Sequence, residues 1–239
     1  MENWHQRTDL ILGETGVNAL AGSRVLVVGA GGVGAYAIEM LARAGVGAID
    51  IIDGDCVGIT NVNRQLPALH STVGIPKVEL MKSRMLDINP EVKVDARCEF
   101  ITADGIENLF ARRSYDFVVD AIDSISPKVA LIEYCLANGI RIISSMGAGG
   151  RLDPSRVKYA DIWSTANDGL AKAVRTRMKK HGIRRKLPVV WSEEPPRKSS
   201  VVMTDEIDFK RSSYGTVSYL PAIFGCMLGA YVIRKLTGE

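Results

Sequence analysis

The sequence contains no CxxC pair, although it has four cysteines, Cys56, Cys98, Cys135 and Cys226. Their spacing excludes a zinc knuckle and a thioredoxin-like redox motif. No basic segment followed by an apolar stretch opens the chain, so we expect no signal peptide. Together these absences predict a cytoplasmic protein with free thiols.

The chain also lacks a long apolar run, an internal repeat and a strong charge imbalance. Residues 219–233 are nearly free of charge but fall short of the ~20 residues that a spanning helix needs. They predict a buried or interface helix, with no stable membrane span. The net charge of +3 over 239 residues is too weak by itself to indicate nucleic acid.

Strand and helix patterns alternate through the first part of the chain. An apolar, β-branched run at 24–30 precedes a glycine-rich turn, a helical pattern at 36–43 and a second strand at 48–53. Further helices are predicted at 78–88 and 126–138, the latter capped by Ser126, with strands at 92–96, 115–120 and 140–144. This order predicts an α/β protein with a Rossmann-like, doubly wound, mainly parallel sheet.

The composition changes after Gly150, where strand signals become fewer and charge, proline and serine increase. We therefore predict one domain over residues 1–239. Residues 1–150 would form its nucleotide-binding half, and residues 151–239 an appended C-terminal region that lies over the sheet.

A glycine-rich turn links the first strand to its helix. Its glycines would let the backbone approach a phosphate, and the helix N-terminus would supply N–H donors. Asp53, about 20 residues further on, can accept hydrogen bonds from ribose hydroxyls. The alternative is that the glycines only permit close packing. The GxGxxG motif consists of Gly29, Gly31, Gly32 and Gly34.

The residues after Asp53 favour ATP over NAD. Arg64 and Lys77 could offset the roughly four negative charges of ATP, although each could also be a solvated surface residue. Asp120 and Asp123 lie at and just past a strand end, where a carboxylate can bind Mg²⁺ beside phosphate. One of the two, more readily Asp120, could instead only cap a turn.

In order and spacing these motifs resemble the ubiquitin-activating-type adenylating enzymes over roughly residues 5–150. The resemblance implies that Asp53 holds the ribose of ATP and that Asp123 works with magnesium near the α-phosphate. It also implies that Arg7 reaches across a homodimer to the partner's γ-phosphate. The implied catalytic residues are Arg7, Arg64, Lys77 and Asp123, and the implied nucleotide-binding residues beyond the glycines are Asp53, Asp55, Asn61, Arg64, Gln65 and Lys77.

One branch, the tRNA threonylcarbamoyladenosine dehydratases, is similar over most of the chain and less so between about 185 and 212. It implies adenylation of the threonine carboxylate on a modified adenosine beside the anticodon, then ring closure that expels AMP. The substrate itself would supply the cyclising nucleophile. A sulfur-transfer protein partner stays open, although Lys210, Arg211 and Ser212 stand where some members carry a cysteine.

A tRNA substrate predicts a basic surface, and one short stretch concentrates the positive charge without any acid. It would contact RNA phosphates by charge alone, although a solvated helix face is the alternative. The predicted tRNA-binding residues are Lys172, Arg175, Arg177, Lys179, Lys180, Arg184, Arg185 and Lys186.

Two glycine-containing segments have further expected roles. The backbone of residues 147–150 could approach the acceptor or bind a monovalent cation, and a plain loop is the alternative. The C-terminal segment carries Gly225 and Gly229 four residues apart, and the resemblance implies that it packs at the dimer interface.

Three other functions compete. An activator of a ubiquitin-like or sulfur-carrier protein would share the nucleotide site, but the missing CxxC pairs and the basic stretch count against it. A non-catalytic nucleotide-binding protein would not be expected to retain Arg7, Arg64 and Asp123. A dinucleotide oxidoreductase would need a hydride-acceptor site, and none is evident in the sequence.

Overall fold

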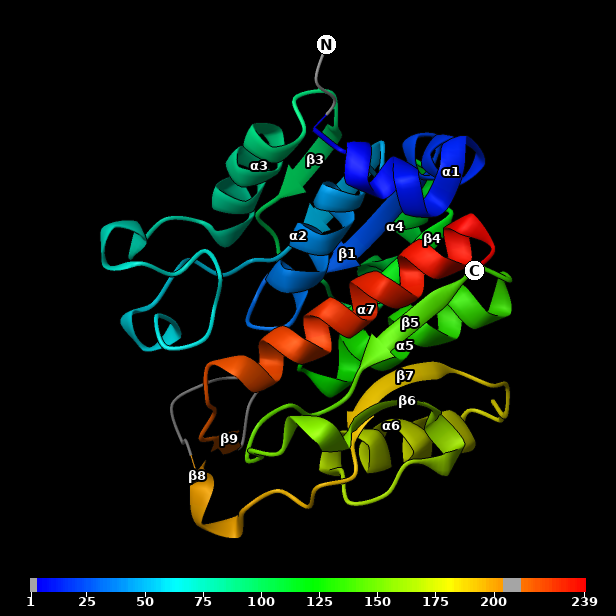
Figure 1. Ribbon diagram of the computed structural model, residues 1–239. Coiled ribbons are helices and arrows are strands. Elements are labelled where there is room, and N and C mark those ends of the chain that lie inside the picture. The colour runs from blue at the N-terminus through cyan, green and yellow to red at the C-terminus, as the bar shows by residue number, and fades with distance from the viewer. Residues whose placement is uncertain (1–3, 204–211) are drawn as a thin grey trace.

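The structure is a computed structural model that describes residues 4–203 and 212–239, and of residues 201–203 and 212–213 only the backbone. Its centre is a seven-stranded sheet with the order β3-β2-β1-β4-β5-β7-β6 (Figure 1). All neighbouring pairs are parallel except β6 and β7. The strands are β1 Arg24–Val28, β2 Ala48–Ile52, β3 Lys93–Arg97, β4 Phe117–Asp120, β5 Ile142–Ser145, β6 Val157–Asp161 and β7 Pro188–Ser192.

Helices cover both faces of the sheet, as the alternating sequence pattern predicts. Successive residues of β1 point to opposite faces, so Val25 and Val27 join one apolar core while Leu26 and Val28 join the other. The first core lies under α1 Gln6–Ala21, α2 Gly34–Ala44, α3 Lys77–Ile88 and α7 Tyr219–Thr237, and the second under α4 Ile106–Ala111, α5 Ile125–Ala137 and α6 Gly169–Lys180.

The predicted doubly wound, mainly parallel sheet is confirmed, with differences in detail. The region after Gly150 does not only lie over the sheet, since β6 and β7 extend it at one edge. It also forms a small antiparallel ladder of β8 Val201–Met203 and β9 Ser212–Tyr214. The N-cap of α5 is Ser124 rather than Ser126, because the helix begins two residues earlier than the proline pattern suggests.

The C-terminal helix α7 packs against α2 along a strip of glycines. A Cβ atom on Gly225 would lie 2.2 Å from the carbonyl oxygen of Val33, and one on Gly229 would lie 2.7 Å from the Cβ atom of Met40. These contacts are closer than any side chain tolerates, so both glycines are required by packing within the chain. The expected burial of α7 is therefore confirmed for the face that carries the two glycines, and this face packs against α2.

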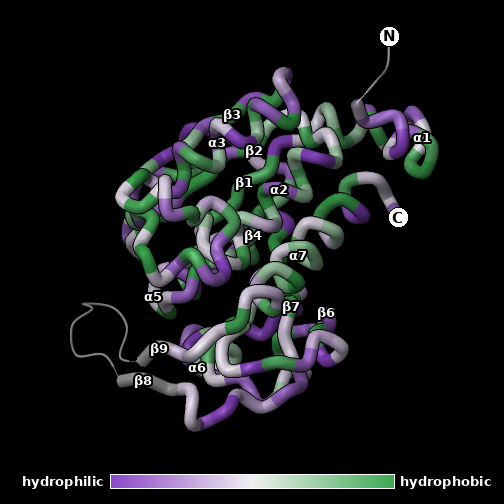
Figure 2. Tube along the Cα trace, turned by 60° about the vertical axis from the view of Figure 1, so that its left-hand side comes forward, coloured by the Kyte–Doolittle hydropathy of each residue, from purple (hydrophilic) through white to green (hydrophobic). Residues whose placement is uncertain are grey.

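The helix α7 is longer than the apolar segment 219–233 identified in the sequence. Its 19 residues make it the one helix in residues 4–203 and 212–239 that is long and apolar enough to cross a membrane by length and composition. Figure 2 shows little hydrophilic colour along its middle. Leu220, Phe224, Leu228 and Val232 nevertheless belong to the first core of the sheet. A buried core helix passes the same test, so packing is the better guide here.

Candidate nucleotide and acceptor site

The glycine-rich turn lies at the carboxyl ends of β1, β2 and β4, which we call the nucleotide edge. Gly29 has a φ of 95°, and a Cβ atom there would lie 2.7 Å from the carbonyl oxygen of Ala121. A Cβ atom on Gly34 would lie 1.7 Å from the carbonyl oxygen of Gly29. No other residue type fits either position, and the turn brings the N-terminus of α2 against the segment that follows β4.

Asp53 lies beside this turn and organises it. Its carboxylate accepts hydrogen bonds from the backbone N–H of Ala30 at 2.6 Å and of Asp55 at 2.8 Å. Burial raises the pKa of Asp53, and the nearby ammonium of Lys77 opposes that shift. Each carboxylate oxygen keeps a second lone pair, which can accept from a ribose hydroxyl.

Lys77 is the first residue of α3, and its side chain is 5% exposed. Its Nζ atom lies 2.7 Å from the Oδ2 atom of Asp55, which is itself half exposed. The surface alternative for Lys77 is therefore wrong. A buried ammonium held by one partly hydrated carboxylate keeps donors available for phosphate oxygens.

The segment that follows the 3₁₀ turn Ile59–Asn61 lies across the glycine-rich turn. The Oδ1 atom of Asn61 accepts from the N–H of Gly58 at 3.0 Å, and Arg64 donates to the carbonyl oxygen of Thr60 and to Asn63. Partial burial lowers the pKa of Arg64, while the charge of Asp123 opposes the shift. Arg64 and Asp123 therefore lie close enough for their charges to interact.

Gln65 packs directly against the glycine-rich turn. A Cβ atom on Gly31 would lie 3.7 Å from its Nε2 atom. The residue is 9% exposed, and its Oε1 atom is buried without a hydrogen-bond partner. An unpaired buried acceptor is uncommon in a folded protein, so this oxygen fits a site completed by a ligand with donor groups, such as ATP.

The two acids after β4 have different surroundings. Asp120 is fully buried and lies 2.8 Å from the Nζ atom of Lys128, which is also fully buried. It also accepts from the hydroxyl of Ser144 at 2.5 Å and from the N–H of Ile122. Asp123 is exposed and lies near Arg64. Asp120 is therefore held by contacts inside the fold, while Asp123 reaches the surface.

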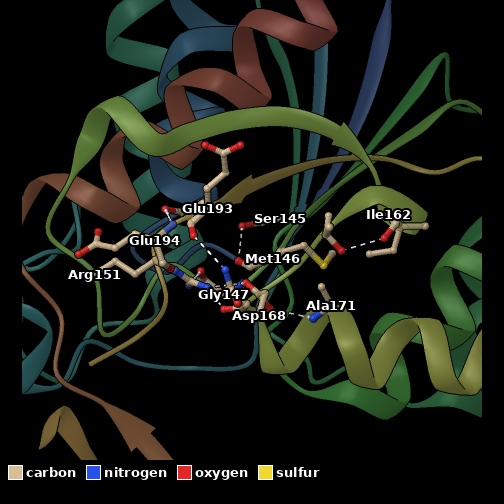
Figure 3. A network of polar contacts seen from close by, with 12 residues as sticks. Ser145, Met146, Gly147, Arg151, Ile162, Asp168, Ala171, Glu193 and Glu194 are labelled. Carbon is tan, nitrogen blue, oxygen red and sulfur yellow. Dashed lines mark hydrogen bonds and ion pairs between the residues drawn. The ribbon is translucent and has the colours of Figure 1, made fainter. Parts of the chain in front are cut away.

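Residues 147–150, which we call the acceptor loop, follow β5 at the same edge. The carboxylate of Asp168 accepts from the N–H of Gly147 at 3.0 Å, while Arg151 donates to the carbonyl oxygen of Gly147. Arg151 and Asp168 form a buried ion pair, N to O 3.0 Å, and Arg151 also donates to the backbone of Asn167 and Glu194 (Figure 3). The loop is thus held at both backbone polar groups of one residue, Gly147.

No sequence motif predicts this network. Arg151, Asp168 and Glu194 belong to no motif, and their separation along the chain hides their contact. One local signal existed for Asp168, which precedes a helical pattern and accepts from the N–H of Ala171 as the N-cap of α6.

The basic stretch forms α6 and the loop that leads into β7. Seven of its eight cationic residues are exposed, but Arg175 is partly buried and donates to Thr165 and to the carbonyl oxygen of Ile162. The helix begins beside the acceptor loop. The loop after the helix lies near the end of α5, where Arg185 donates to the carbonyl oxygen of Leu136.

Arg7 lies away from the nucleotide edge of its own chain. It is exposed near the start of α1. The neighbouring Trp4 and His5 line a cleft together with Arg24 and Lys93, which begin β1 and β3. The first residues of these strands mark the amino edge of the sheet, opposite to the glycine-rich turn.

Known proteins resemble this chain over nearly its full length. It is 44% identical over 239 residues to the tRNA threonylcarbamoyladenosine dehydratase of Bacillus subtilis, covering 96% of this chain and 93% of that protein. The crystal structure of the E. coli tRNA N6-threonylcarbamoyladenosine dehydratase TcdA in complex with ATP superimposes with a TM-score of 0.89 at 35% identity, covering 98% and 93% of the two chains.

Similarity to proteins named adenylyltransferase and sulfurtransferase covers less of the chain. The adenylyltransferase and sulfurtransferase UBA4 of Lodderomyces elongisporus is 39% identical over 128 residues, which cover 54% of this chain and 28% of that protein. The model of the ThiF family, in contrast, matches residues 5–239. With the glycine-rich turn, Asp53, Arg64, Lys77 and Asp123 gathered at one edge, the chain belongs to the ThiF family.

Proposed function

We propose that this protein uses ATP to adenylate the carboxylate of threonylcarbamoyladenosine in tRNA and then closes the ring with loss of water. The observation that carries the proposal is the cluster at the nucleotide edge, where buried Lys77 and partly buried Arg64 flank the glycine-rich turn while Asp123 stays exposed. Near full-length similarity to dehydratases supports the choice of substrate.

The residues of this cluster have separate tasks in the proposed reaction. Asp53 holds the ribose, the N–H groups at the start of α2 meet the phosphates, and Lys77 and Arg64 offset their charge. Bound ATP supplies the adenylyl group, and magnesium adds charge neutralisation. The described residues contain no group of three metal-binding side chains, but Mg²⁺ is commonly held by one or two carboxylates plus substrate phosphates, so Asp123 fits.

The chemistry proceeds in two balanced steps. A substrate carboxylate oxygen bonds to the α-phosphorus, and pyrophosphate leaves with the bridging oxygen. An atom of the substrate's own carbamoyl group then attacks the activated carbonyl carbon, AMP leaves with one of the original carboxylate oxygens, and the carbamoyl group loses one proton to solvent. Positioning and charge stabilisation suffice for both steps, so no protein thiol is needed. Burial raises the pKa of Cys135 to about 12, which makes it unsuited to act as a nucleophile.

Release of AMP and pyrophosphate tests the proposal. Purified protein and ATP are incubated with threonylcarbamoyl-modified tRNA or with unmodified transcript. We expect AMP only with the modified tRNA, together with the loss of one water from the nucleoside by mass spectrometry. Pyrophosphate exchange on adding a carrier protein that ends in Gly-Gly, with neither RNA active, would favour the alternative of a ubiquitin-like or sulfur-carrier activator.

The proposal includes a homodimer in which Arg7 acts on the partner's γ-phosphate. Its support is that Arg7 lies at the amino edge of its own chain, away from its own nucleotide edge. Arg7→Ala and Asp123→Ala proteins are each expected to be inactive, and mixed dimers should recover part of the activity because one site is intact. No recovery in hybrids verified by mass spectrometry would contradict a role across the dimer.

The basic surface of α6 would hold the tRNA by its phosphates. Replacing Lys179, Lys180 and Arg184 with alanine should weaken tRNA binding and reduce its dependence on salt. The variant would make fewer phosphate contacts, so fewer counterions would be released when it binds. Binding of ATP should not change. Equal salt slopes for wild type and variant would assign these residues to a solvated face.

Three further expectations belong to the same proposal. A cytoplasmic location fits the four cysteines, which are all free. The carbonyl oxygen of Gly147 already accepts from Arg151, and that of Gly150 accepts from the N–H of Arg197. A monovalent cation at the acceptor loop would therefore share these oxygens with existing hydrogen bonds. A potassium titration of AMP release tests it. Lys210 and Arg211, which bear on the possible sulfur-transfer partner, lie outside the described residues.

A further inference from the structure

The acceptor loop is built as a rigid support. Asp168 and Arg151 hold the N–H and the carbonyl oxygen of Gly147, and Arg151 is only 3% exposed. A Cβ atom on Gly147 would lie 3.2 Å from a carboxylate oxygen of Asp168. At its other end, the N–H of Gly150 donates to the carbonyl oxygen of Gly215 at 2.8 Å. The backbone between these anchors therefore has little freedom to move.

Tyr214 lies on this support. A Cβ atom on Gly149 would lie 2.7 Å from the Cβ atom of Tyr214, and one on Gly150 would lie 3.1 Å from its Cδ1 atom. The two glycines thus leave room for the tyrosine to rest against the backbone. Tyr214 is still 43% exposed, which is a large aromatic surface to leave in water.

The segment that carries Tyr214 reaches the nucleotide edge. The side-chain amide of Asn63 donates to the carbonyl oxygen of Thr216 at 2.9 Å. A Cβ atom on Gly32 would lie 3.2 Å from the Cβ atom of Pro221. The residues that follow Tyr214 therefore connect the acceptor loop to the glycine-rich turn.

The charges nearby suit RNA. Asp168, which holds the acceptor loop, also caps α6, and its carbonyl oxygen accepts from the N–H of Lys172. The side chain of Lys172 is exposed, so the first turn of the basic helix begins beside the support. Unstacked bases of single-stranded RNA loops are bound by stacking on aromatic side chains next to phosphate-binding cations.

We propose that Tyr214 is the stacking surface for the purine ring of the adenosine whose carboxylate is activated, with the acceptor loop as its rigid backing. This inference rests on the proposed function and adds a specificity residue to it. Stacking on Tyr214 would hold the base while its threonylcarbamoyl arm extends toward the α-phosphate.

Substitutions at Tyr214 test the inference through the KM for modified tRNA. Loss of one base stack raises KM by about 5- to 150-fold, so Tyr214→Ala should show an increase in this range, with the dissociation constant of ATP unchanged. Tyr214→Phe and Tyr214→Trp should restore KM because both keep an aromatic face. Tyr159→Ala is the matched control, since Tyr159 is 39% exposed and lies on edge strand β6.

A binding measurement separates this inference from the proposed function. Fluorescence of the Tyr214→Trp protein should be quenched by a modified anticodon stem-loop, even in the absence of ATP. A KM for Tyr214→Ala within twofold of wild type, or no quenching, would overturn the stacking role. Equal loss in the alanine and phenylalanine variants, with weaker ATP binding, would also overturn it in favour of a purely structural role. Quenching without AMP release from wild type would instead contradict the adenylation step alone.

Discussion

Asp120 and Lys128 form an ion pair of 2.8 Å in which both side chains are fully buried. Asp120 is the last residue of β4, three residues before the exposed Asp123. Two acids three residues apart therefore differ in environment: Asp120 is buried between the ends of β4 and β5, while Asp123 is exposed near Arg64.

Substitutions should separate the roles of these two acids. Asp120→Ala leaves the charge of Lys128 buried and unpaired, so we expect a loss of about 3–5 kcal/mol in the free energy of unfolding. Asp123→Ala should unfold like wild type yet lose AMP release by at least about 100-fold. Urea denaturation and the tRNA-dependent AMP assay measure the two effects. The site assignment would be falsified if Asp123→Ala kept wild-type turnover.

Lys77 should be essential for turnover without being essential for the fold. Its partner Asp55 is half exposed and can be hydrated when the ammonium is removed, so Lys77→Ala should fold normally and lose nearly all AMP release. Lys82→Ala, on the same helix, is the control and should remain active. Circular dichroism and the AMP assay report the two properties, and more than a tenth of wild-type turnover in Lys77→Ala would argue against a phosphate role.

The raised pKa of Asp53 predicts a pH dependence of nucleoside binding. Only the ionised carboxylate accepts from both ribose hydroxyls and both backbone N–H groups. Burial raises the pKa of Asp53, so this carboxylate becomes protonated at a higher pH than an ordinary aspartate. When the solution is acidified, the affinity for the nucleoside should therefore begin to fall at that higher pH. Adenosine is the suitable probe, since it has no phosphate to titrate. Calorimetry should show that Asp53→Asn binds adenosine more weakly and that its affinity depends less on pH. Parallel pH profiles of affinity for the variant and the wild type would exclude Asp53 as the cause.

The glycine strip of α7 should be sensitive to a single methyl group. Gly225→Ala would push α7 away from Val33 and Tyr36 in the helix that carries the phosphate-binding N–H groups. We expect a loss of about 1–3 kcal/mol in the free energy of unfolding and weaker ATP binding. Gly169→Ala is the control, because a Cβ atom there meets nothing within 4 Å. Equal stability of the two variants would mean that the helices adjust without strain.

The sequence was most informative where local chemistry determines structure. The strands β1 and β2 and the helix that joins them are encoded within about thirty consecutive residues, and their prediction is confirmed, while the ribose role of Asp53 stays a prediction. The burial of Lys77 could not be predicted from the sequence, because its partner Asp55 lies on another segment.

Long-range packing explains what the sequence did not reveal. The antiparallel β6 pairs with β7 across the whole of α6, and the Arg151–Asp168 pair joins two loops. Arg175 illustrates the same limit, because its membership of a basic stretch did not indicate that it turns inward to Thr165. Such contacts form between residues whose types carry no motif, so only the fold reveals them.

The position of α7 has a consequence for biosynthesis. The core beneath α2 is completed by Leu220, Phe224 and Leu228, which a ribosome adds after every strand of the central sheet. Until then the side of α2 that packs against α7 is uncovered, and the growing chain exposes it to the surrounding solution. The nucleotide-binding half is therefore expected to reach its final packing only after residues 219–237 are made, and chaperone contact with α2 should end when α7 docks.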